Sequence, residues 1–514
     1  MHSKHHRLML RLFMLIILGL SLPVWVNPLA ARSPAAGPDI PEVTFAGTLR
    51  GRIQPAHFST VQSRVTLPAT FSGGPTVLTN REGATNPVTI TLGSPTTPNL
   101  AHIAESWNAT VSGAIAASVV WSESTLLSGT VTINPGVILT ILPGVTVFGG
   151  PGAELVVNGT LIAGGTPEAP IYFTSSSASP APGDWLGIRI SKSSQDFYMA
   201  YTLVQYAENG VFFRANAEGS ANLSGTIHHS TLQHNQRGLH VYVRPDASPW
   251  TFTAASHVTV THNLIYSNTI AGMVFSTDAG GGTTLNSSLV EHNRIEENAT
   301  GILITSNTWW LGHSNNHPII RNNSLRANET YGIDIAGYGS SDGSGSDTKV
   351  LPTVENNLFD ANATGLRLYL NPQGADGTQL VNPTVRYNTF RNGQTGILLE
   401  DLQAYDTLTA TIETNVFYGF AGVDAGAYAI ENTTGRGIVA DDNYWGDDPA
   451  EWAIGATGVI TGLITFNTVR TAADAPVLTH VAPGSGVAGG TVTLHGANFG
   501  EMARVYLPLI VRFD

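Results

Sequence analysis

Short apolar segments of three to five residues, rich in Ile, Val, Leu and Phe, recur along the middle of the chain and are separated by Asn and Gly. The clearest unit spans 321–335 and reads as a strand, an Asn turn, a short strand, a second Asn turn, a Gly and a further strand. The leading asparagines of five such units are Asn263, Asn293, Asn323, Asn357 and Asn388. Their successive spacings of 30, 30, 34 and 31 positions predict a solenoid or repeat array.

The segments are too short for helices, and their residue types favour strands. Asn and Gly suit the sharp corners between them, because both tolerate left-handed backbone. Stacked coils would enclose a continuous core in which each strand pairs with the coils above and below. Leucine-rich repeats fit less well, because they need a denser Leu ladder and a shorter period. We therefore predict an all-β chain whose central part is a right-handed parallel β-helix.

This interpretation makes specific predictions for single residues. The side chains expected in the core are Leu325, Ile333, Ile335, Phe359, Leu366, Phe390 and Ile397. The repeated asparagines should stack into ladders that satisfy backbone groups at the corners. Gly332, Gly365 and Gly396 each precede a strand, where a left-handed or crowded backbone is expected.

The first 31 residues have the pattern of a secretion signal. Lys4, Arg7 and Arg11 precede the apolar stretch 12–22, and the small residues Ala30 and Ala31 suit cleavage. A membrane span is the alternative, but the apolar stretch is short and is followed by prolines. We expect export with cleavage, a secreted or cell-surface location, and no membrane span afterwards.

Residues 32–127 contain alternating strand-like segments broken by Gly and Pro, after a Ser/Pro/Ala-rich leader. They fit either a small β-domain or an irregular cap on the solenoid. From 128 to 468 the strand pattern is regular, with Pro-Gly corners in 130–147, a Gly183-Asp184-Trp185 turn, and a closing Asp442-Asn443-Tyr444-Trp445-Gly446. This stretch resembles secreted bacterial right-handed β-helix proteins of the pectate-lyase-like superfamily, which are built from PbH1-type repeats.

The resemblance implies a pectin-lyase-like fold and, in the enzymes of that superfamily, a polysaccharide groove on one strand face and its neighbouring loops. It does not select a function, since the superfamily contains lyases, hydrolases, epimerases and non-enzymatic surface proteins. Residues 469–514 hold a linker and then a segment, 476–500, that is similar to the first two strands of an IPT/TIG immunoglobulin-like module. The chain is too short there for a complete sandwich. A hairpin packed on the end of the solenoid is the alternative.

Composition narrows the possible partners. The formal net charge is −13, and removal of 1–31 takes away three cations and no anions, which gives −16. An acidic chain argues against nucleic acid as a partner. Charged residues make up only 12% of the chain, against about a quarter in typical globular domains, and there are no cysteines to form disulfides. We expect a monomer held together by its core and strand ladders.

Because side chains alternate along a strand, the second residue after each repeated Gly should point outward. This outward column is His240, Val274, Leu303, Asp334, Arg367, Leu398 and Asp424. Two positions further on, the second column is Tyr242, Ser276, Thr305, Ala336, Tyr369 and Glu400. Asp334, Arg367 and Glu400 should therefore lie together with Tyr369, as a candidate catalytic cluster. The alternative is an ion pair between coils that only stabilises the strands.

The segments after these strands vary in length and were expected to form loops along one rim of the solenoid. They are 244–256, 306–318, 337–352, 371–383 and 401–407. Their aromatic residues are candidates for stacking on sugar rings. With Tyr369, the candidate substrate-binding residues are Trp250, Trp309, Trp310, Tyr338 and Tyr405.

Other motifs lack the context that their chemistry needs. The Gly-x-Ser-x-Gly pattern at 339–343 lies in a loop rather than a strand-to-helix elbow. His313 and His317 are four residues apart without a helix to align them, so no metal site is predicted. Asp342 and Asp347 leave calcium as a possible cofactor, with no other cofactor expected. The Asp pairs around 444–446 are expected to close a coil rather than to catalyse glycoside hydrolysis.

Three functions remain open from the sequence. The leading hypothesis is a non-catalytic secreted or surface protein that binds a polysaccharide, a cell-surface glycan or another surface. The second is a lyase or glycoside hydrolase for an acidic polysaccharide that uses Asp334, Arg367 and Glu400. The third is a structural stalk.

Overall fold

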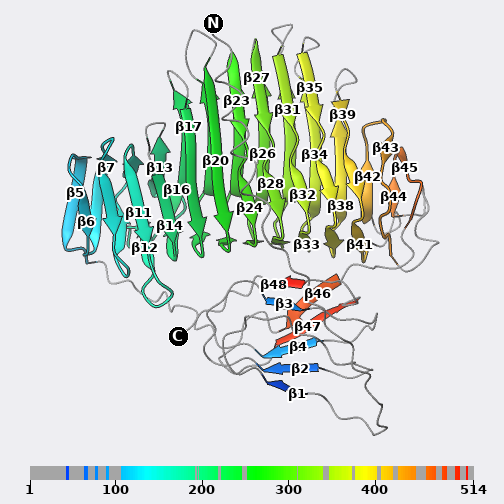
Figure 1. The fold of residues 1–514 in the computed structure, drawn as a ribbon, viewed down its shortest axis with the longest axis horizontal. Helices are drawn as coiled ribbons and strands as arrows, with labels where there is room; N and C mark the ends of the chain where they lie inside the picture. The colour runs from blue at the N-terminus through cyan, green and yellow to red at the C-terminus, as the bar shows by residue number, and fades with distance from the viewer. Residues whose placement is uncertain are drawn as a thin grey trace, which may run out of the picture. The chain divides into compact units, whose positions relative to one another are not determined.

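A computed structural model describes residues 106–469 with short gaps at 192–193, 195, 218–220, 246–251, 309–310, 340–345, 373–376, 402–406, 421–425 and 447–458. It also describes seven strands outside this range, within 42–91 and 477–507. The described residues contain no α-helix, and 106–469 form a parallel β-solenoid of about 9 turns (Figure 1). The predicted fold class is confirmed.

Each central coil has three groups of strands, which we call the long, short and split faces. The long face consists of β16 (Ala207–Ala217), β19 (Arg237–Pro245), β22 (Ala271–Ala279), β26 (Thr300–Thr308), β30 (Tyr331–Gly339), β34 (Thr364–Pro372), β38 (Thr395–Asp401) and β42 (Tyr428–Asn432). The short face consists of β15 (Thr202–Gln205), β18 (Thr231–Gln233), β21 (Leu264–Tyr266), β25 (Arg294–Glu296), β29 (Ser324–Arg326), β33 (Leu358–Asp360), β37 (Thr389–Arg391) and β41 (Val416–Tyr418).

The split face begins as single strands and then divides into two strands per coil. It consists of β14 (Asp196–Ala200), β17 (Ala221–His228), β20 (Thr253–Thr261), β23 (Gly282–Asn286), β24 (Leu289–Glu291), β27 (Gly312–Asn316), β28 (Ile319–Arg321), β31 (Ser346–Val350), β32 (Thr353–Glu355), β35 (Gly377–Val381), β36 (Thr384–Arg386), β39 (Thr407–Leu408) and β40 (Thr411–Glu413). The described strands of all three faces pair only in parallel with the neighbouring coils.

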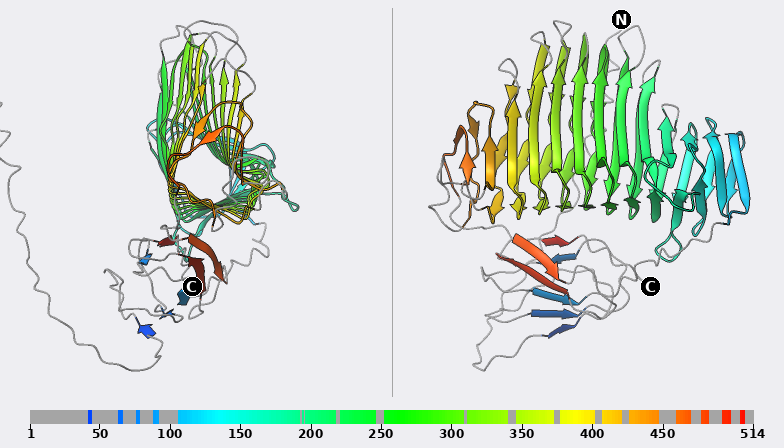
Figure 2. Two further views of the ribbon diagram at one scale, coloured as in Figure 1. Left: turned by 90° about the vertical axis from the view of Figure 1, so that its right-hand side faces the viewer. Right: turned by 180° about the vertical axis from the view of Figure 1, so that it is seen from behind.

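Shorter coils precede and follow this central part. The first strands are β5 (Ala109–Ile115), β6 (Val119–Trp121), β7 (Thr125–Ile133), β8 (Ile138–Ile141), β9 (Thr146–Gly149), β10 (Glu154–Val157), β11 (Thr160–Gly164), β12 (Ile171–Ser175) and β13 (Trp185–Ser191). The last are β43 (Ile438–Val439), β44 (Ile460–Thr461) and β45 (Ile464–Thr465). Viewed along the stack of coils, the strands surround a ring, and some of them extend past the ring on one side (Figure 2).

The predicted core residues point into this ring. Leu325, Ile333, Ile335, Leu366, Phe390 and Ile397 are fully buried, and Phe359 is 1% exposed. Aromatic rings stack along the axis: Phe359 on Phe390 at 4.4 Å and Phe390 on Phe417 at 5.0 Å between ring centroids. Burial of identical residues in successive coils therefore gives a continuous apolar column, as the repeat pattern predicts.

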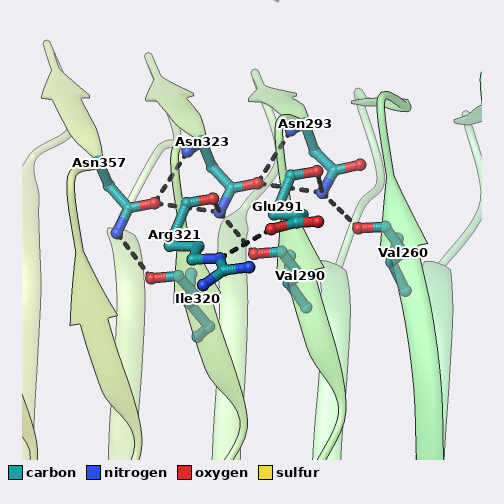
Figure 3. A network of polar contacts seen from close by, with 8 residues as sticks. All are labelled: Val260, Val290, Glu291, Asn293, Ile320, Arg321, Asn323 and Asn357. Carbon is teal, nitrogen blue, oxygen red and sulfur yellow. Dashed lines mark hydrogen bonds and ion pairs between the residues drawn. The ribbon is translucent and has the colours of Figure 1, made fainter. Parts of the chain in front are cut away.

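Asparagine ladders line the corners on both sides of the short face. Asn293 donates its side-chain amide to the carbonyl of Val260 at 2.9 Å and to the side-chain oxygen of Asn323 at 3.0 Å (Figure 3). The first ladder is Asn263, Asn293, Asn323, Asn357, Asn388, Asn415 and Asn443. The second is Asn235, Asn268, Asn298, Asn328 and Asn362. The buried polar groups at the corners are thus paired with the next coil, as predicted.

The residue before each asparagine of the first ladder, rather than a glycine, adopts the left-handed conformation. Examples are His262, His292 and Asn322, with φ between 57° and 58°. Gly332, Gly365 and Gly396 do not have positive φ. A Cβ on Gly365 would lie 2.6 Å from the carbonyl oxygen of Gly396. Of the two expectations for these glycines, the crowded backbone is the one that the structure contains.

The ranges expected to be rim loops are strand at their ends, which was not predicted, and the middle of each range lies outside the described residues. The range 306–318 holds the end of β26 and all of β27, and 337–352 holds the end of β30 and all of β31. Inward-facing residues here are small and polar, such as Ser306, Ser314 and Thr348, each of them fully buried. Ser306 Oγ lies 2.7 Å from Ser314 Oγ, and Thr348 Oγ1 lies 2.7 Å from Thr308 Oγ1. These strands therefore enclose a polar interior, which lacks the apolar signal of a β-strand.

Strands from the two ends of the chain share one sheet. Its order is β1 (Glu42–Thr44), β2 (Ser63–Thr66), β4 (Val88–Thr91), β47 (Val492–Ala497) and β46 (Val477–Ala482). β3 (Thr76–Leu78) pairs with β48 (Val505–Leu507) in a separate antiparallel ladder. β46 and β47 form an antiparallel pair. The IPT/TIG resemblance and the predicted domain boundaries stay predictions. Within the described part of the chain, no helix has the length and apolar character to cross a membrane.

Candidate functional site

The predicted outward columns of the long face occur in the predicted register. Asp334 pairs with Arg367, and Tyr369 pairs with Glu400 on the next strand. The first column continues from Leu398 to Glu431, so the assignment of Asp424 to that column was wrong. The error arises because Gly422 precedes Asp424 as in the repeat, although Asp424 lies only 26 positions after Leu398 and Glu431 lies 33 positions after it. Asp424 itself lies outside the described residues. The column contains Glu431 in its place.

Asp334 and Arg367 form a two-pronged ion pair across β30 and β34. Arg367 Nε donates to Asp334 Oδ1 at 2.8 Å, and Nη2 donates to Oδ2 at 2.7 Å. The remaining nitrogen, Nη1, lies 3.5 Å from Oε2 of Glu400. All three predicted residues are therefore together, and every guanidinium nitrogen of Arg367 faces a carboxylate of the protein itself.

Two tyrosine rings enclose the Arg367 guanidinium. Its Cζ lies 4.4 Å from the ring centroid of Tyr331 and 4.7 Å from that of Tyr369. Tyr338 meets Tyr369 edge-on, with 6.1 Å between ring centroids. Tyr331, Tyr338 and Tyr369 are partly exposed, so the described surface here consists of aromatic rings around a neutralised ion pair.

Burial shifts the ionisation of the carboxyl groups in this cluster. It raises the pKa of Asp334, while the hydrogen bond and charge of Arg367 act in the opposite direction. Burial also raises the pKa of Glu431, with a hydrogen bond from Thr395 opposing it and the charge of Glu400 adding to it. For Arg367, burial acts to lower the pKa, but the interaction with Asp334 outweighs it and the net pKa is raised. The two-pronged hydrogen bond from Arg367 thus stabilises the charged form of Asp334 against the effect of burial.

Similar acid–Arg pairs link neighbouring coils elsewhere on the solenoid. On the split face, Glu291 accepts from Arg321 at 2.7 Å (Figure 3) and Glu355 accepts from Arg386 at 3.0 Å. On the short face, Asp360 accepts from Arg391 at 2.7 Å, and in the first coils Glu154 accepts from Arg189 at 2.7 Å. Asp334 and Arg367 share this arrangement, which supports the structural explanation of their pairing. The enclosing tyrosines are what distinguish the long-face pair.

Of the predicted aromatic contacts, Tyr338 and Tyr369 lie in this cluster. Trp250, Trp309, Trp310 and Tyr405 lie outside the described residues, so their participation stays a prediction. Tyr331 and Glu431 were not predicted. Tyr331 could have been found from its position immediately before the repeated Gly332, which places it beside the outward column.

The other motifs occupy structural positions. His313 Nδ1 lies 3.3 Å from Asp347, which also lies 3.5 Å from Lys349 Nζ. Asp342 lies outside the described residues, so calcium binding at that loop stays a prediction. Across the described part of the chain, no group of three or more His, Asp or Glu side chains is arranged to hold a metal ion. Trp445 is buried and stacks on Phe417 at 4.9 Å, as expected of a segment that closes a coil.

Four aromatic rings that were not predicted from the sequence stack along one corner of the solenoid, which we call the histidine corner. Tyr201, His229, His262 and His292 occupy the left-handed positions of four successive coils. Their rings stack at 5.1, 5.0 and 5.0 Å between centroids. The signal was present, because each of the last two histidines directly precedes a ladder asparagine. Burial and the neighbouring imidazoles lower the pKa of His262 to about 4.

No protein-family model matches the chain, and no curated protein does. Among solved structures, the chain is similar to one described as the crystal structure of the Agl-KA catalytic domain, with 16% sequence identity and a TM-score of 0.35. The match covers 65% of this chain and 63% of that chain, so it spans less than two thirds of either.

Proposed function

We propose that this chain is an exported, non-catalytic β-solenoid that binds a polysaccharide on its long face. The observation that carries the proposal is the state of Arg367. Its Nε and Nη2 are hydrogen-bonded to Asp334, its Nη1 faces Glu400, and its Cζ lies 4.4 and 4.7 Å from the ring centroids of Tyr331 and Tyr369. An arginine held in this way is not free to receive a substrate carboxylate or to move a proton.

The groups that remain for a ligand are aromatic. Tyr331, Tyr338 and Tyr369 come from two neighbouring strands, which lie about 4.8 Å apart in a sheet. Partly exposed rings at this spacing provide apolar area with a hydrogen-bonding hydroxyl, the combination that suits a sugar ring. The neighbouring carboxylates Glu400 and Glu431 add negative charge, so we expect a neutral chain to bind better than a polyanion.

The test is affinity electrophoresis of the purified chain through gels that contain neutral or acidic polysaccharides, with parallel assays for reducing ends and unsaturated products. We expect retention by at least one polysaccharide without turnover. Tyr338→Ala with Tyr369→Ala, and separately Trp309→Ala with Trp310→Ala, should each weaken retention about tenfold, which corresponds to about 1.4 kcal/mol. Tyr418→Ala is the matched control, because Tyr418 is 43% exposed on the short face.

An enzyme is the second candidate, and one observation favours it. Asp334 and Glu431 are carboxyl groups whose pKa is raised, which is common among catalytic acids. Turnover of any polysaccharide by the parent chain, abolished by Arg367→Ala, would establish the enzyme and reject the binding proposal. Neither retention nor turnover on a broad panel would reject both and favour a structural stalk.

A further inference from the structure

Tyr198, His228 and His229 form a hydrogen-bonded chain of side chains beside the histidine corner. Tyr198 lies on β14 and His228 ends β17, so the two come from neighbouring coils of the split face. His228 Nε2 lies 3.0 Å from the Tyr198 hydroxyl, and His228 Nδ1 lies 2.9 Å from Nδ1 of His229. His229 is exposed and His228 is partly exposed, so solvent reaches the point where the two Nδ1 atoms meet.

We propose that His228 and His229 chelate a divalent transition-metal ion through their Nδ1 atoms. Metal–imidazole bonds are about 2.0–2.1 Å long, so two nitrogens bound at a right angle to one ion are about 2.9 Å apart. The observed Nδ1–Nδ1 distance of 2.9 Å has this value. Only a rotation of the rings that turns both lone pairs toward one point is required. The ion then replaces the hydrogen bond between two nitrogens that otherwise share one proton.

The surroundings hold both rings in place for this role. Metal-bound imidazoles usually donate their second N–H to a fixed acceptor, which sets the tautomer and orientation of the ring. The Tyr198 hydroxyl oxygen is that acceptor for His228 Nε2. His229 is held between the rings of Tyr201 and His262, at 5.1 and 5.0 Å. These contacts keep the two Nδ1 atoms next to each other before the ion binds, so that binding requires only the ring rotation.

The geometry favours copper among the divalent ions. Two imidazoles at a right angle suit a square-planar or tetragonal ion, with water at the remaining positions. Cu²⁺ and Ni²⁺ prefer this geometry, whereas Zn²⁺ prefers a tetrahedron, in which the nitrogens would be further apart. Cu²⁺ also has the highest affinity for nitrogen ligands in the first-row series. The inference concerns a corner between the split and short faces, so it stands independently of the proposed polysaccharide site.

The test is a Cu²⁺ titration of the full chain by calorimetry and electron paramagnetic resonance. His228→Gln and His229→Asn should each remove one equivalent of bound Cu²⁺, together with a spectrum that shows two imidazole nitrogens. Asn is chosen at 229 because it tolerates the left-handed backbone found there. Tyr198→Phe should lower the affinity for this Cu²⁺ ion by about tenfold or more, because the imidazole of His228 loses its orienting hydrogen bond.

His292→Asn is the matched control, because His292 belongs to the same stack and is separated from His229 by the ring of His262. It should leave the copper stoichiometry unchanged. His2, His5 and His6 at the N-terminus are present in every variant, so their copper binding cancels in the comparison. Circular dichroism of each variant establishes that the fold is retained. A stoichiometry and affinity unaltered in both His228→Gln and His229→Asn, or lowered equally by His292→Asn, would overturn the proposal.

Discussion

The central coils contain two different interiors within one solenoid. In the ring, the inward side chains are large and apolar, as in the stack of Phe359, Phe390 and Phe417. Between the ends of β22 and β26 and the strands β23 and β27, the inward side chains are mostly small and polar, such as Thr277, Thr284, Ser306 and Ser314. Ser314 there contacts the hydroxyls of Thr277, Thr284 and Ser306 at 2.9, 3.2 and 2.7 Å. Both interiors are buried, but different interactions hold them together.

The difference shows how a parallel solenoid can extend its strands beyond its apolar core. A serine hydroxyl donates one hydrogen bond and accepts two, so three hydroxyl neighbours satisfy Ser314 completely. Stacking places the same arrangement in successive coils, as in the pair Thr308 and Thr348 at 2.7 Å. The apolar interior is stabilised by the removal of apolar surface from water. In the polar interior, the hydrogen bonds add little net stability, but removal of one partner leaves a buried group unsatisfied and is strongly destabilising.

The largest expected effect is in the apolar interior. Phe390 is fully buried, with a ring on each side at 4.4 and 5.0 Å. Phe390→Ala should lower the free energy of unfolding by about 3–5 kcal/mol, because it opens a cavity in a stack that cannot collapse. Urea denaturation followed by circular dichroism measures the loss. Tyr418→Ala on the exposed surface should change it by less than about 0.5 kcal/mol; equal losses in both would show that the stack contributes no special stability.

The next effect separates the polar interior from the apolar one. Ser314→Ala should cost about 1–3 kcal/mol, because it leaves three buried hydroxyls short of a partner. Replacement of all four groups, with Thr277→Val, Thr284→Val, Ser306→Ala and Ser314→Ala together, removes donors and acceptors alike. The quadruple variant should therefore be more stable than the single variant in the same urea experiment. Additive losses over the four sites would contradict this and make each hydroxyl independently stabilising.

A third effect concerns the spacing between coils, on which both interiors depend. A Cβ on Gly365 would lie 2.6 Å from the Gly396 carbonyl oxygen and 2.7 Å from Cδ1 of Phe390. Gly365→Ala should cost about 1–3 kcal/mol through this overlap. Gly129→Ala is the control, because no atom lies within 4 Å of its added Cβ and its φ is not positive. The same Tm for both variants would show that neighbouring coils move apart to accommodate the added methyl group without loss of stability.

Only one of the two interiors was predictable from the sequence. Inward residues such as Ile333 and Leu366 carry the apolar period of two, and their place in the core was predicted and is confirmed. Ser306 and Ser314 alternate with the same period, but Ser, Thr and Asn are also the residues of loops, so these strands were taken for a rim. Hydrogen bonds between residues of neighbouring coils, far apart in the sequence, decide such cases, and the order of residues along the chain does not show them.

The candidate site divides in a similar way. The register of Asp334, Arg367 and Glu400 followed from the repeat, because identical spacing places equivalent residues side by side. Tyr331, which lies against Arg367, precedes the strand pattern and was not considered. Glu431 lies 33 positions after Leu398, as Arg367 lies 33 after Asp334, but the Gly422-Val423-Asp424 motif comes earlier in the chain and was assigned instead. Periodicity thus predicts the site where each coil holds one matching motif, while a choice between two matching motifs requires the structure.

The smallest expected effect lies outside both interiors, at the histidine corner, and is specific to pH. Burial and the adjacent imidazoles of His229 and His292 lower the pKa of His262 to about 4, below the 6.5 of an unperturbed histidine. Between these two values the unfolded chain binds a proton that the folded chain does not. The contribution of this group to stability is therefore complete above about pH 6.5 and is lost as the pH falls toward about 4.

Asn occupies the same left-handed corner at 322 and 356, so His262→Asn with His292→Asn should be tolerated by the backbone. The double variant and the parent share every carboxylate, and acid unfolding through those groups is common to both. On a shift from pH 7 to pH 5, the parent should therefore lose a few degrees more in Tm than the double variant. The apolar and polar interiors named above contain no ionisable side chain, so Ser314→Ala should keep the parent's pH dependence. If the double variant also kept it, the imidazoles of His262 and His292 would titrate alike in the folded and unfolded chain. The pH dependence would then arise in the other histidines whose pKa is lowered by burial, such as His240, or in the ion pairs between coils.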